Sequence, residues 1–318
     1  MIDKYFKKLS WLDYKLIMSP QLCLGTVQFG MDYGLTNKYG KVNASSVKEI
    51  VQIAFSGGIK FLDTSQRYGE AEEVLGNVIT MHQKFKIINK FVSNSSNQWS
   101  SKDIKNWEKR FQESLQKLKV NKIDSFLVHH HKDLIREDAE FLLGWLESLK
   151  ERTLINRIGV SIYEVSDLDL LPLDRLELVQ LPLSIYDQSF LNTGTIDYLV
   201  SAGISVHIRS IFLQGLLLNK TENWPDFLSK EFLEHHSCFC RELKKLNLNP
   251  LDAVMDFTNR CSGIEAALIG VTNQSEISDI LSRFNYYSNN YKNSEPICYS
   301  SWAWTKKNDV DPRTWPSI

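Results

Sequence analysis

Four side chains of different chemistry stand at or just after the ends of short apolar runs, namely Asp63, Tyr68, Lys90 and His129. A tyrosine hydroxyl can donate a proton to a developing alkoxide, and a nearby ammonium group that lowers its pKa favours this donation. Lys90 can supply the ammonium group, and Asp63 is its expected partner because a buried ammonium needs a counter-charge. A neutral His129 can donate a hydrogen bond to a carbonyl oxygen. These residue types favour the reduction of a carbonyl group.

Three consecutive histidines, His129, His130 and His131, also raise the question of a metal site. Three successive side chains of a strand cannot converge on one ion, and no acidic residue lies at ligand spacing. We therefore expect no bound metal. Alternation along the strand would place His129 and His131 on the same face.

The elements that must position these residues alternate along the chain. Short apolar runs predict strands over residues 22–26, 59–64, 85–91, 123–130, 154–162, 176–184, 204–212 and 265–271. Helical spacing of apolar residues predicts helices over residues 44–58, 70–79, 100–120, 137–152, 194–203, 225–246, 250–261 and 275–284. Eight such units without a linker predict an α/β protein with a (β/α)8 TIM barrel, whose functional side chains lie at the carboxyl ends of the strands.

The composition limits the remaining classes of protein. We expect one domain over residues 1–318, with the barrel core at about 20–285 and an irregular C-terminal tail at 286–318. The net charge of −1 provides no general attraction for nucleic acid or membrane surfaces. The first 18 residues carry lysine and aspartate throughout, unlike a signal peptide. The five cysteines form no C-x-x-C pair. These features predict a cytoplasmic protein and leave its oligomeric state open.

Eight segments resemble, in order, those of the aldo-keto reductases, over about residues 20–285. The most specific are an Asp-Thr pair separated by three residues from Tyr-Gly (63–69) and an Asp separated by four residues from His (124–129). The segments are GTVQFG (25–30), FLDTSQRYGEAEEVLG (61–76), IINKF (87–91), SLQKLKVNKIDSFLVHH (114–130), IGVSIY (158–163), VQLPLSIYD (179–187), RSIFLQGLL (209–217) and ALIGVTN (267–273). The resemblance implies that an aldehyde or ketone is reduced, with Asp63, Tyr68, Lys90 and His129 catalytic and Tyr68 as proton donor.

The resemblance also implies a nicotinamide dinucleotide cofactor, NADP or NAD, bound without a Rossmann fold. The absence of a G-x-G-x-x-G motif agrees with this mode of binding. The implied contacts begin with Gly25 and Thr26 beneath the nicotinamide and Ser161 and Gln180 on its carboxamide. The other implied cofactor residues are Arg209, Ser210, Leu213, Gln214, Gly215, Gly270, Thr272 and Glu276.

The sequence departs from the family pattern at several of these positions. Arg209 replaces an aromatic residue that stacks on the nicotinamide, Thr272 replaces a basic residue that binds the adenosine 2′-phosphate, and Ile280 replaces an asparagine on the adenine. Ile211 also stands where a proline is expected. Because Thr272 is not basic, the preference between NAD and NADP stays open.

The segment RSIFLQGLL further resembles a bacterial branch of the family that is associated with surface polysaccharides and nucleotide sugars. The expected substrate is therefore a small carbonyl compound, with sugars and nucleotide sugars among the candidates. Two other functions remain open. One is a reductase-like module that binds a nucleotide but catalyses weakly, and the other is an epimerase or dehydratase that uses the cofactor transiently. The tail tryptophans, Trp302, Trp304 and Trp315, are expected to pack in the core.

Overall fold

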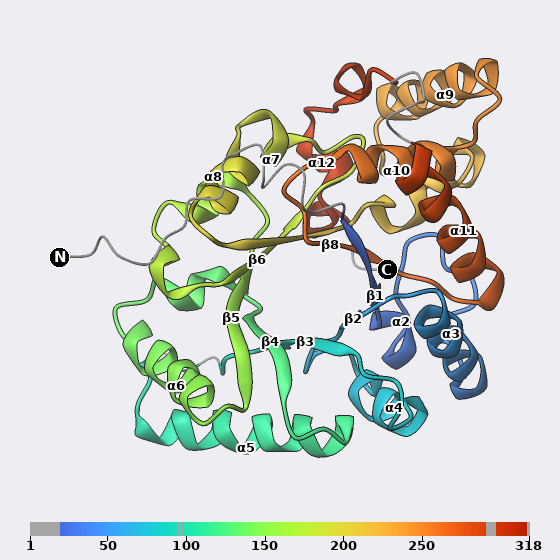
Figure 1. The fold of residues 1–318 in the computed structure, drawn as a ribbon. Coiled ribbons are helices and arrows are strands. Elements are labelled where there is room, and N and C mark those ends of the chain that lie inside the picture. The colour runs from blue at the N-terminus through green and yellow to red at the C-terminus, as the bar shows by residue number, and fades with distance from the viewer. Residues whose placement is uncertain (1–19, 95, 97, 291–296, 317–318) are drawn as a thin grey trace.

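The computed structural model describes residues 20–94, 96, 98–290 and 297–316. Eight parallel strands form a closed barrel in the order of the sequence, and β8 pairs with β1 to complete it (Figure 1). The predicted (β/α)8 TIM barrel is confirmed. The strands are β1 (Gln21–Gly25), β2 (Phe61–Asp63), β3 (Lys86–Phe91), β4 (Ile123–Val128), β5 (Ile155–Ser161), β6 (Leu178–Pro182), β7 (Ser205–Arg209) and β8 (Ala266–Ile269).

Helices surround the barrel, except between β5 and β6, where the described chain makes only two 3-10 turns, Val165–Leu168 and Leu173–Arg175. The helices before β6 are α2 (Val27–Gly30), α3 (Ala44–Ser56), α4 (Ala71–Val78), α5 (Ser101–Leu118) and α6 (Ala139–Glu151). Those after β6 are α7 (Ser189–Asn192), α8 (Thr195–Ser201), α9 (Lys230–Lys245), α10 (Pro250–Arg260), α11 (Gln274–Asn290) and α12 (Lys307–Val310).

Local signals account for the helix boundaries. Ser100 and Asp103 form a reciprocal capping box at the start of α5. The predicted end of the last long helix, at residue 284, is wrong because α11 continues to Asn290. Its buried positions include Ile277 and Phe284 and continue at helical spacing to Tyr287, so another turn of the helix is held against the core.

Every strand except β3 ends one to three residues earlier than the sequence predicts, and the ends of β7 and β4 bear on the site. β7 stops at Arg209 because Ser210 adopts a left-handed backbone conformation with φ of 62°, which a strand cannot continue. β4 stops at Val128, so none of the three histidines belongs to a strand. The prediction that alternation places His129 and His131 on one face is therefore wrong.

The barrel interior and the helix–strand layer form two hydrophobic clusters. The interior cluster is small and buried, with Cys23, Phe61, Ile88, Leu127, Leu178 and Ala266. At the amino-terminal end of the strands, Arg157 lies 2.9 Å from Asp124 and 2.7 Å from Glu265, and His207 lies 2.8 Å from the same Glu265. This ion network joins β4, β5 and β7 to the start of β8 and lies away from the carboxyl ends.

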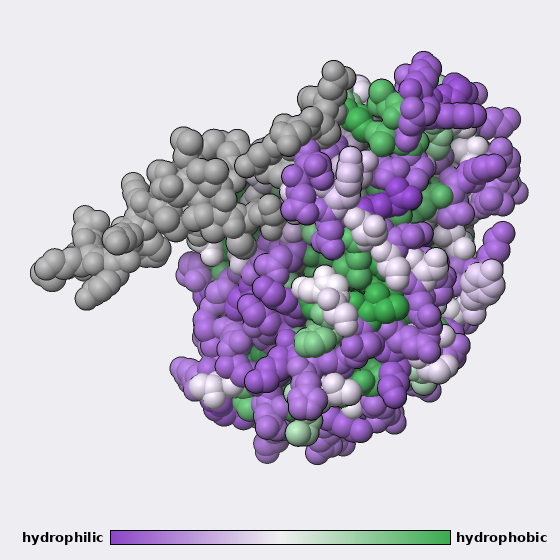
Figure 2. Space-filling view, turned by 45° about the vertical axis from the view of Figure 1, so that its right-hand side comes forward, coloured by the Kyte–Doolittle hydropathy of each residue, from purple (hydrophilic) through white to green (hydrophobic). Residues whose placement is uncertain are grey.

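The described part of the tail consists of short turns, Tyr299–Trp302, α12 and Pro312–Thr314, joined by irregular chain. Trp302, Trp304 and Trp315 pack against the hydrophobic core, as expected. Hydrophilic side chains dominate the surface in Figure 2, and hydrophobic ones gather near the centre of that face. No helix in the described residues is long and apolar enough to cross a membrane. The expectation about the first 18 residues lies outside the part of the chain that the structure describes.

Candidate active site

A cavity of about 480 Å³ opens at the carboxyl ends of the strands. Every residue that the sequence proposes for the site lines this cavity, with the exception of Leu213. The Leu213 side chain is 1% exposed and packs in the hydrophobic core instead. The fold therefore brings residues from β1, β2, β3, β5 and β6, and from the chain that follows β4, β7 and β8, into one space.

A buried ion pair lies at the floor of the cavity. Lys90, at the end of β3, donates to the Asp63 carboxylate at the end of β2, and both side chains are 2% exposed. The second carboxylate oxygen of Asp63 accepts from Gln180 Nε2 at 2.8 Å. Burial alone would lower the pKa of Lys90, but Asp63 and Tyr68 outweigh it and raise the pKa. Lys90 is therefore charged at neutral pH.

Tyr68 lies above this pair, on the loop between β2 and α4. Its hydroxyl oxygen accepts from Lys90 Nζ at 3.3 Å. Burial raises the pKa of Tyr68, and this effect exceeds the lowering by the Lys90 ammonium group. The expectation that Lys90 gives Tyr68 a low pKa is wrong in its net direction, because desolvation of the phenolate is the larger effect. The phenol consequently carries its proton at neutral pH.

His129 faces Tyr68 across the cavity, with the two rings edge to face and their centroids 6.2 Å apart. Its Nδ1 lies 3.2 Å from Ser65 Oγ. Burial lowers the pKa of His129 to about 2, and the positive charge of Lys90 contributes to the same shift. The imidazole is therefore neutral at physiological pH.

The other two histidines contact residues away from the cavity. His130 Nε2 lies 3.0 Å from an Arg67 nitrogen, and His131 Nε2 lies 3.2 Å from the Asp167 carboxylate. No group of His, Cys, Asp and Glu within the described residues could hold a metal ion. The three histidines thus take three separate partners.

The cavity wall has close approaches at two glycines and side-chain acceptors that lack donors. A Cβ atom on Gly270 would lie 2.9 Å from Gln28 Nε2, and one on Gly25 would lie 3.3 Å from the Ile269 carbonyl oxygen. Gln180 Oε1 and Gln28 Oε1 are buried without a hydrogen-bond partner. Gln28 also lines the cavity but was not among the predicted site residues.

The loop after β7 has an unusual backbone. Positive φ values occur at Ser210 (62°), Leu213 (48°), Gln214 (52°) and Gly215 (91°). Non-glycine residues in this conformation store strain, which is concentrated at functional sites. Thr36 crosses over the loop and donates to the Gln214 carbonyl oxygen at 3.3 Å. A Cβ atom on Gly215 would lie 2.0 Å from Thr36 Oγ1, so this crossing requires glycine.

Sequence reasoning missed the segment that carries Thr36. The cavity residues of this segment are Tyr33, Gly34, Thr36, Asn37 and Tyr39. Tyr33 and Tyr39 are 42% and 89% exposed. Two exposed tyrosines in a long connection directly after a barrel strand are a signal that could have indicated this segment.

At the other rim of the cavity, the Glu276 carboxylate accepts hydrogen bonds from the residues that precede α11. Thr272 donates to Glu276 from its backbone nitrogen at 2.7 Å and from Oγ1 at 3.1 Å. Asn273 Nδ2 donates to the same carboxylate at 2.9 Å. Hydrogen bonds thus bring the predicted residues Thr272 and Glu276 together.

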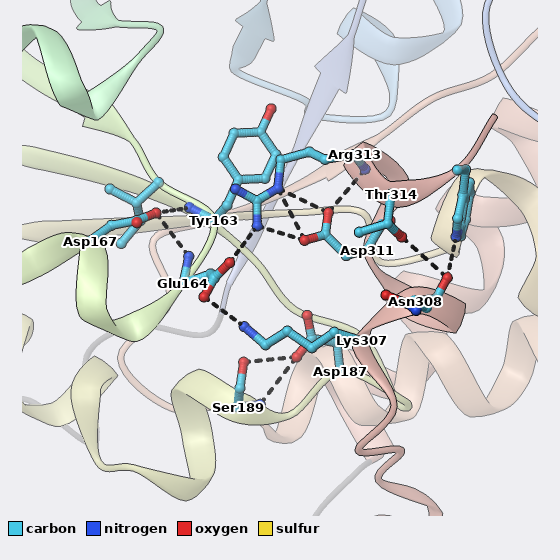
Figure 3. Close-up of polar contacts among 12 residues, drawn as sticks. Tyr163, Glu164, Asp167, Asp187, Ser189, Lys307, Asn308, Asp311, Arg313 and Thr314 are labelled. Carbon is cyan, nitrogen blue, oxygen red and sulfur yellow. Dashed lines mark hydrogen bonds and ion pairs between the residues drawn. The ribbon is translucent and has the colours of Figure 1, made fainter. Parts of the chain in front are cut away.

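The C-terminal tail packs on Tyr163, a cavity residue after β5 that the sequence did not indicate. The guanidinium carbon of Arg209 lies over the Tyr163 ring, 4.1 Å from the ring centroid. The guanidinium carbon of Arg313, in the tail, lies 4.3 Å from the same centroid. Arg313 donates to the Glu164 carboxylate at 2.8 Å and to the Asp311 carboxylate at 2.6 Å. Figure 3 shows Arg313 between these two residues. The position of Tyr163, two residues after Ser161, was the available signal, whereas its contact with Arg313 spans too much sequence for any pattern to show.

The comparisons with known proteins agree with this geometry. The Aldo/keto reductase family model matches residues 21–293. An aldo-keto reductase from Bacillus halodurans in its holo form is 15% identical, with a TM-score of 0.65 over 86% of this chain and 91% of that one. A glycerol dehydrogenase from Gluconobacter oxydans is 18% identical, with a TM-score of 0.65 over 93% of each chain.

At these identities the solved structures establish the fold alone. No curated protein matches the chain significantly. The family match, however, covers most of the sequence and the whole of the barrel. The chain belongs to the aldo/keto reductase family.

Proposed function

We propose that the protein is an NAD(P)H-dependent oxidoreductase that reduces an aldehyde or ketone to an alcohol. The observation that carries this proposal is the hydrogen-bonded chain from Asp63 through Lys90 to a protonated Tyr68, beside a neutral His129. Such a chain holds a proton donor and a cation that stabilises the donor after it has lost its proton.

The cavity fits a nicotinamide cofactor. The unpartnered oxygen of Gln180 can accept a hydrogen bond from the carboxamide, and the Ser161 hydroxyl lies on the same wall. The glycine positions, Gly25 and Gly270, leave room for a flat ring. The left-handed backbone at Gln214 and Gly215 lines the same cavity, in the conformation from which anion-binding concavities are built.

A bound dihydronicotinamide would supply the hydride. Tyr68 Oη then donates its proton to the carbonyl oxygen, and Lys90 stabilises the resulting phenolate at 3.3 Å. Asp63 holds Lys90 in place. If Ser65 donates to Nδ1 of His129, the ring carries its proton on Nε2 and can orient the carbonyl oxygen.

The substrate class that we propose is a small polyhydroxy carbonyl compound, with sugars and nucleotide sugars included. The structurally similar glycerol dehydrogenase is named for a polyol, and the segment around Gln214 resembles the branch associated with nucleotide sugars. Either NADH or NADPH is the reductant. No basic side chain accompanies Thr272 and Glu276 among the described hydrogen bonds of that rim.

The test is the substitution Tyr68→Phe. The purified protein is titrated with NADH and with NADPH, and consumption of the better ligand is then followed with a panel of aldehydes and aldoses. Because a positioned general acid contributes about 10²- to 10⁴-fold, Tyr68→Phe should lower kcat by at least about 100-fold. Cofactor affinity should change little. The matched control is Tyr33→Phe, which removes from the same cavity a phenol that makes no hydrogen bond to Lys90 Nζ in the described chain.

Three other outcomes would contradict the proposal. Undiminished turnover by Tyr68→Phe would remove the tyrosine from the chemistry. Cofactor binding without oxidation by any carbonyl compound would favour a nucleotide-binding module. Product formation without net loss of reduced cofactor would favour an epimerase or dehydratase.

A further inference from the structure

Arg209 is a cavity cation that lacks a carboxylate partner within the described residues. Lys90, the other basic residue of the cavity lining, is paired with Asp63. Arg209 donates only to neutral oxygens, those of the Ile162 carbonyl at 2.9 Å and the Ser210 hydroxyl at 3.4 Å. A guanidinium group has five N–H donors. Most of the donors of Arg209 therefore remain available, together with an uncompensated charge.

The side chain of Arg209 is held by a stack that reaches the surface. Its guanidinium packs on Tyr163, and that ring also packs on Arg313 of the tail. The charge of Arg313 is balanced by Asp311 and Glu164, and Lys307 adds a second contact to Glu164 at 3.2 Å (Figure 3). Only the inner guanidinium of this stack is left without a counter-charge.

Arg209 lines the same cavity as Tyr68 and His129. Burial is the main cause of the low pKa of His129, and the charge of Arg209 lowers it further. Arg209 also opposes the effect of burial on Tyr68. Asp63 is the carboxylate of this end, and it is already engaged by Lys90 and Gln180. The end of the cavity that receives the carbonyl group therefore carries excess positive charge.

We propose that Arg209 binds an anionic group, a carboxylate or a phosphate, on the carbonyl substrate. Tyr163 and Arg313 are positioning residues that fix the plane of its guanidinium. The proposal deepens the reductase function and rests on it. Planar, bidentate recognition of carboxylate or phosphate is the contact for which arginine is suited. The phosphates of the cofactor offer the same chemistry, so the experiment must separate the two sources.

The experiment compares carbonyl compounds that differ by one anionic group. The pairs are butanal and 4-oxobutanoate, D-glucose and D-glucuronate, and D-glyceraldehyde and its 3-phosphate. The wild type should reduce the anionic member of at least one pair with the higher kcat/KM. Arg209→Gln should reduce that preference about 10- to 100-fold, the effect of losing a hydrogen bond between charged groups. The loss should fall mainly on KM, and Arg209→Lys should restore part of it.

Two further variants separate a positioning role from a general loss of charge. Arg313→Gln should shift the preference in the same direction by less than Arg209→Gln. Arg152→Gln removes a guanidinium that pairs with Glu108 on the outer helices, and it should leave the preference unchanged. Calorimetric titration with succinate provides a readout without turnover, and it should show binding to the wild type that Arg209→Gln weakens.

The outcomes also separate the two proposals. If no carbonyl compound oxidises the cofactor, the reductase function fails, and absence of succinate binding would overturn the anion site independently. If the neutral compounds are reduced equally well or better, only the anion site fails. If Arg209→Gln weakens binding of NADH or NADPH as much as it raises KM, Arg209 serves the cofactor and the proposal is overturned.

Discussion

Burial determines the protonation of the two rings that face each other in the cavity. It raises the pKa of Tyr68, which therefore keeps its proton, and it lowers the pKa of His129, which therefore stays neutral. Both effects have one physical origin, because a site with little water disfavours the charged form of either group. A proton donor and a neutral hydrogen-bond donor are thus obtained at the same pH.

The low pKa of His129 predicts how stability depends on pH. The folded-state value of about 2 lies below the usual 6.5, so the unfolded chain binds a proton that the folded one does not. This contribution to stability is complete above pH 6.5 and is lost as pH falls below it, by about 1.4 kcal/mol per pH unit. Denaturant unfolding at pH 7.5, 6.5 and 5.5 should show stability falling as pH falls in the wild type, with a further contribution from His236, whose pKa burial lowers to about 4.

In the same series, the free energy of unfolding of His129→Gln should depend less steeply on pH, by the contribution of one proton. His82→Gln is the matched control, since His82 is exposed on the far side of α4 from the cavity lining. Equal slopes for the wild type and His129→Gln would mean that folding does not lower the pKa of His129.

At this scale, residue types were more predictable than their contacts. Asp63, Tyr68, Lys90 and His129 could be found because each follows a recognisable apolar run, and the barrel brings strand ends together. Tyr163 could not be assigned its role, because its partners come from β7 and from the tail. The direction of the Tyr68 pKa shift could not be predicted either, because the spacing of residues does not report how deeply a side chain is buried.

Among the elements, α4 and α5 pack so closely that one position of their contact has no room for a side chain. Gly76, in α4, is buried, and a Cβ atom there would lie 1.9 Å from the backbone oxygen of Lys117 in α5. α4 begins three residues after Tyr68, so this contact also fixes the loop that carries the proposed proton donor. The sequence predicted both helices but not their distance, because helical spacing does not report which backbones touch.

Replacing Gly76 by alanine should therefore be costly. Overpacking against rigid backbone costs about 1–3 kcal/mol, and we expect the upper part of this range for Gly76→Ala. Gly144→Ala is the matched substitution, because Gly144 is an exposed position within α6 whose Cβ would meet nothing within 4 Å. It should stabilise the protein by about 0.5–1 kcal/mol. Denaturant midpoints of the two variants should move in opposite directions, and a shared direction would contradict this account of the packing.

At the scale of the whole molecule, the two ends of the barrel have different tasks. The carboxyl ends carry the cavity, and the amino-terminal ends carry the ion network of Arg157, Asp124, Glu265 and His207. Burial by itself would raise the pKa of Glu265, but His207 and Arg157 lower it to about 2. The network holds strands together without contacting the cavity lining.

Substitution of Glu265 should consequently affect stability alone. Glu265→Gln weakens hydrogen bonds between charged groups and should destabilise the protein by about 2–3 kcal/mol near neutral pH. Because the pKa of Glu265 is lowered, this difference should shrink as pH falls from 4.5 towards 2. The kcat/KM of the folded enzyme, measured well below its unfolding temperature, should stay within about twofold of the wild type. A parallel loss of kcat/KM and stability would show that the two ends are coupled.

The pairing of β1 with β8 has a consequence for folding during synthesis. The partner of Cys23 is Leu268, so one edge of the first strand stays open until nearly the whole chain has left the ribosome. At a translation rate of about 5–20 residues per second, that edge waits on the order of 10–50 s. An open strand edge is a template for pairing with other chains. Until β8 has been made, the nascent chain therefore exposes an edge at which it can pair with other chains.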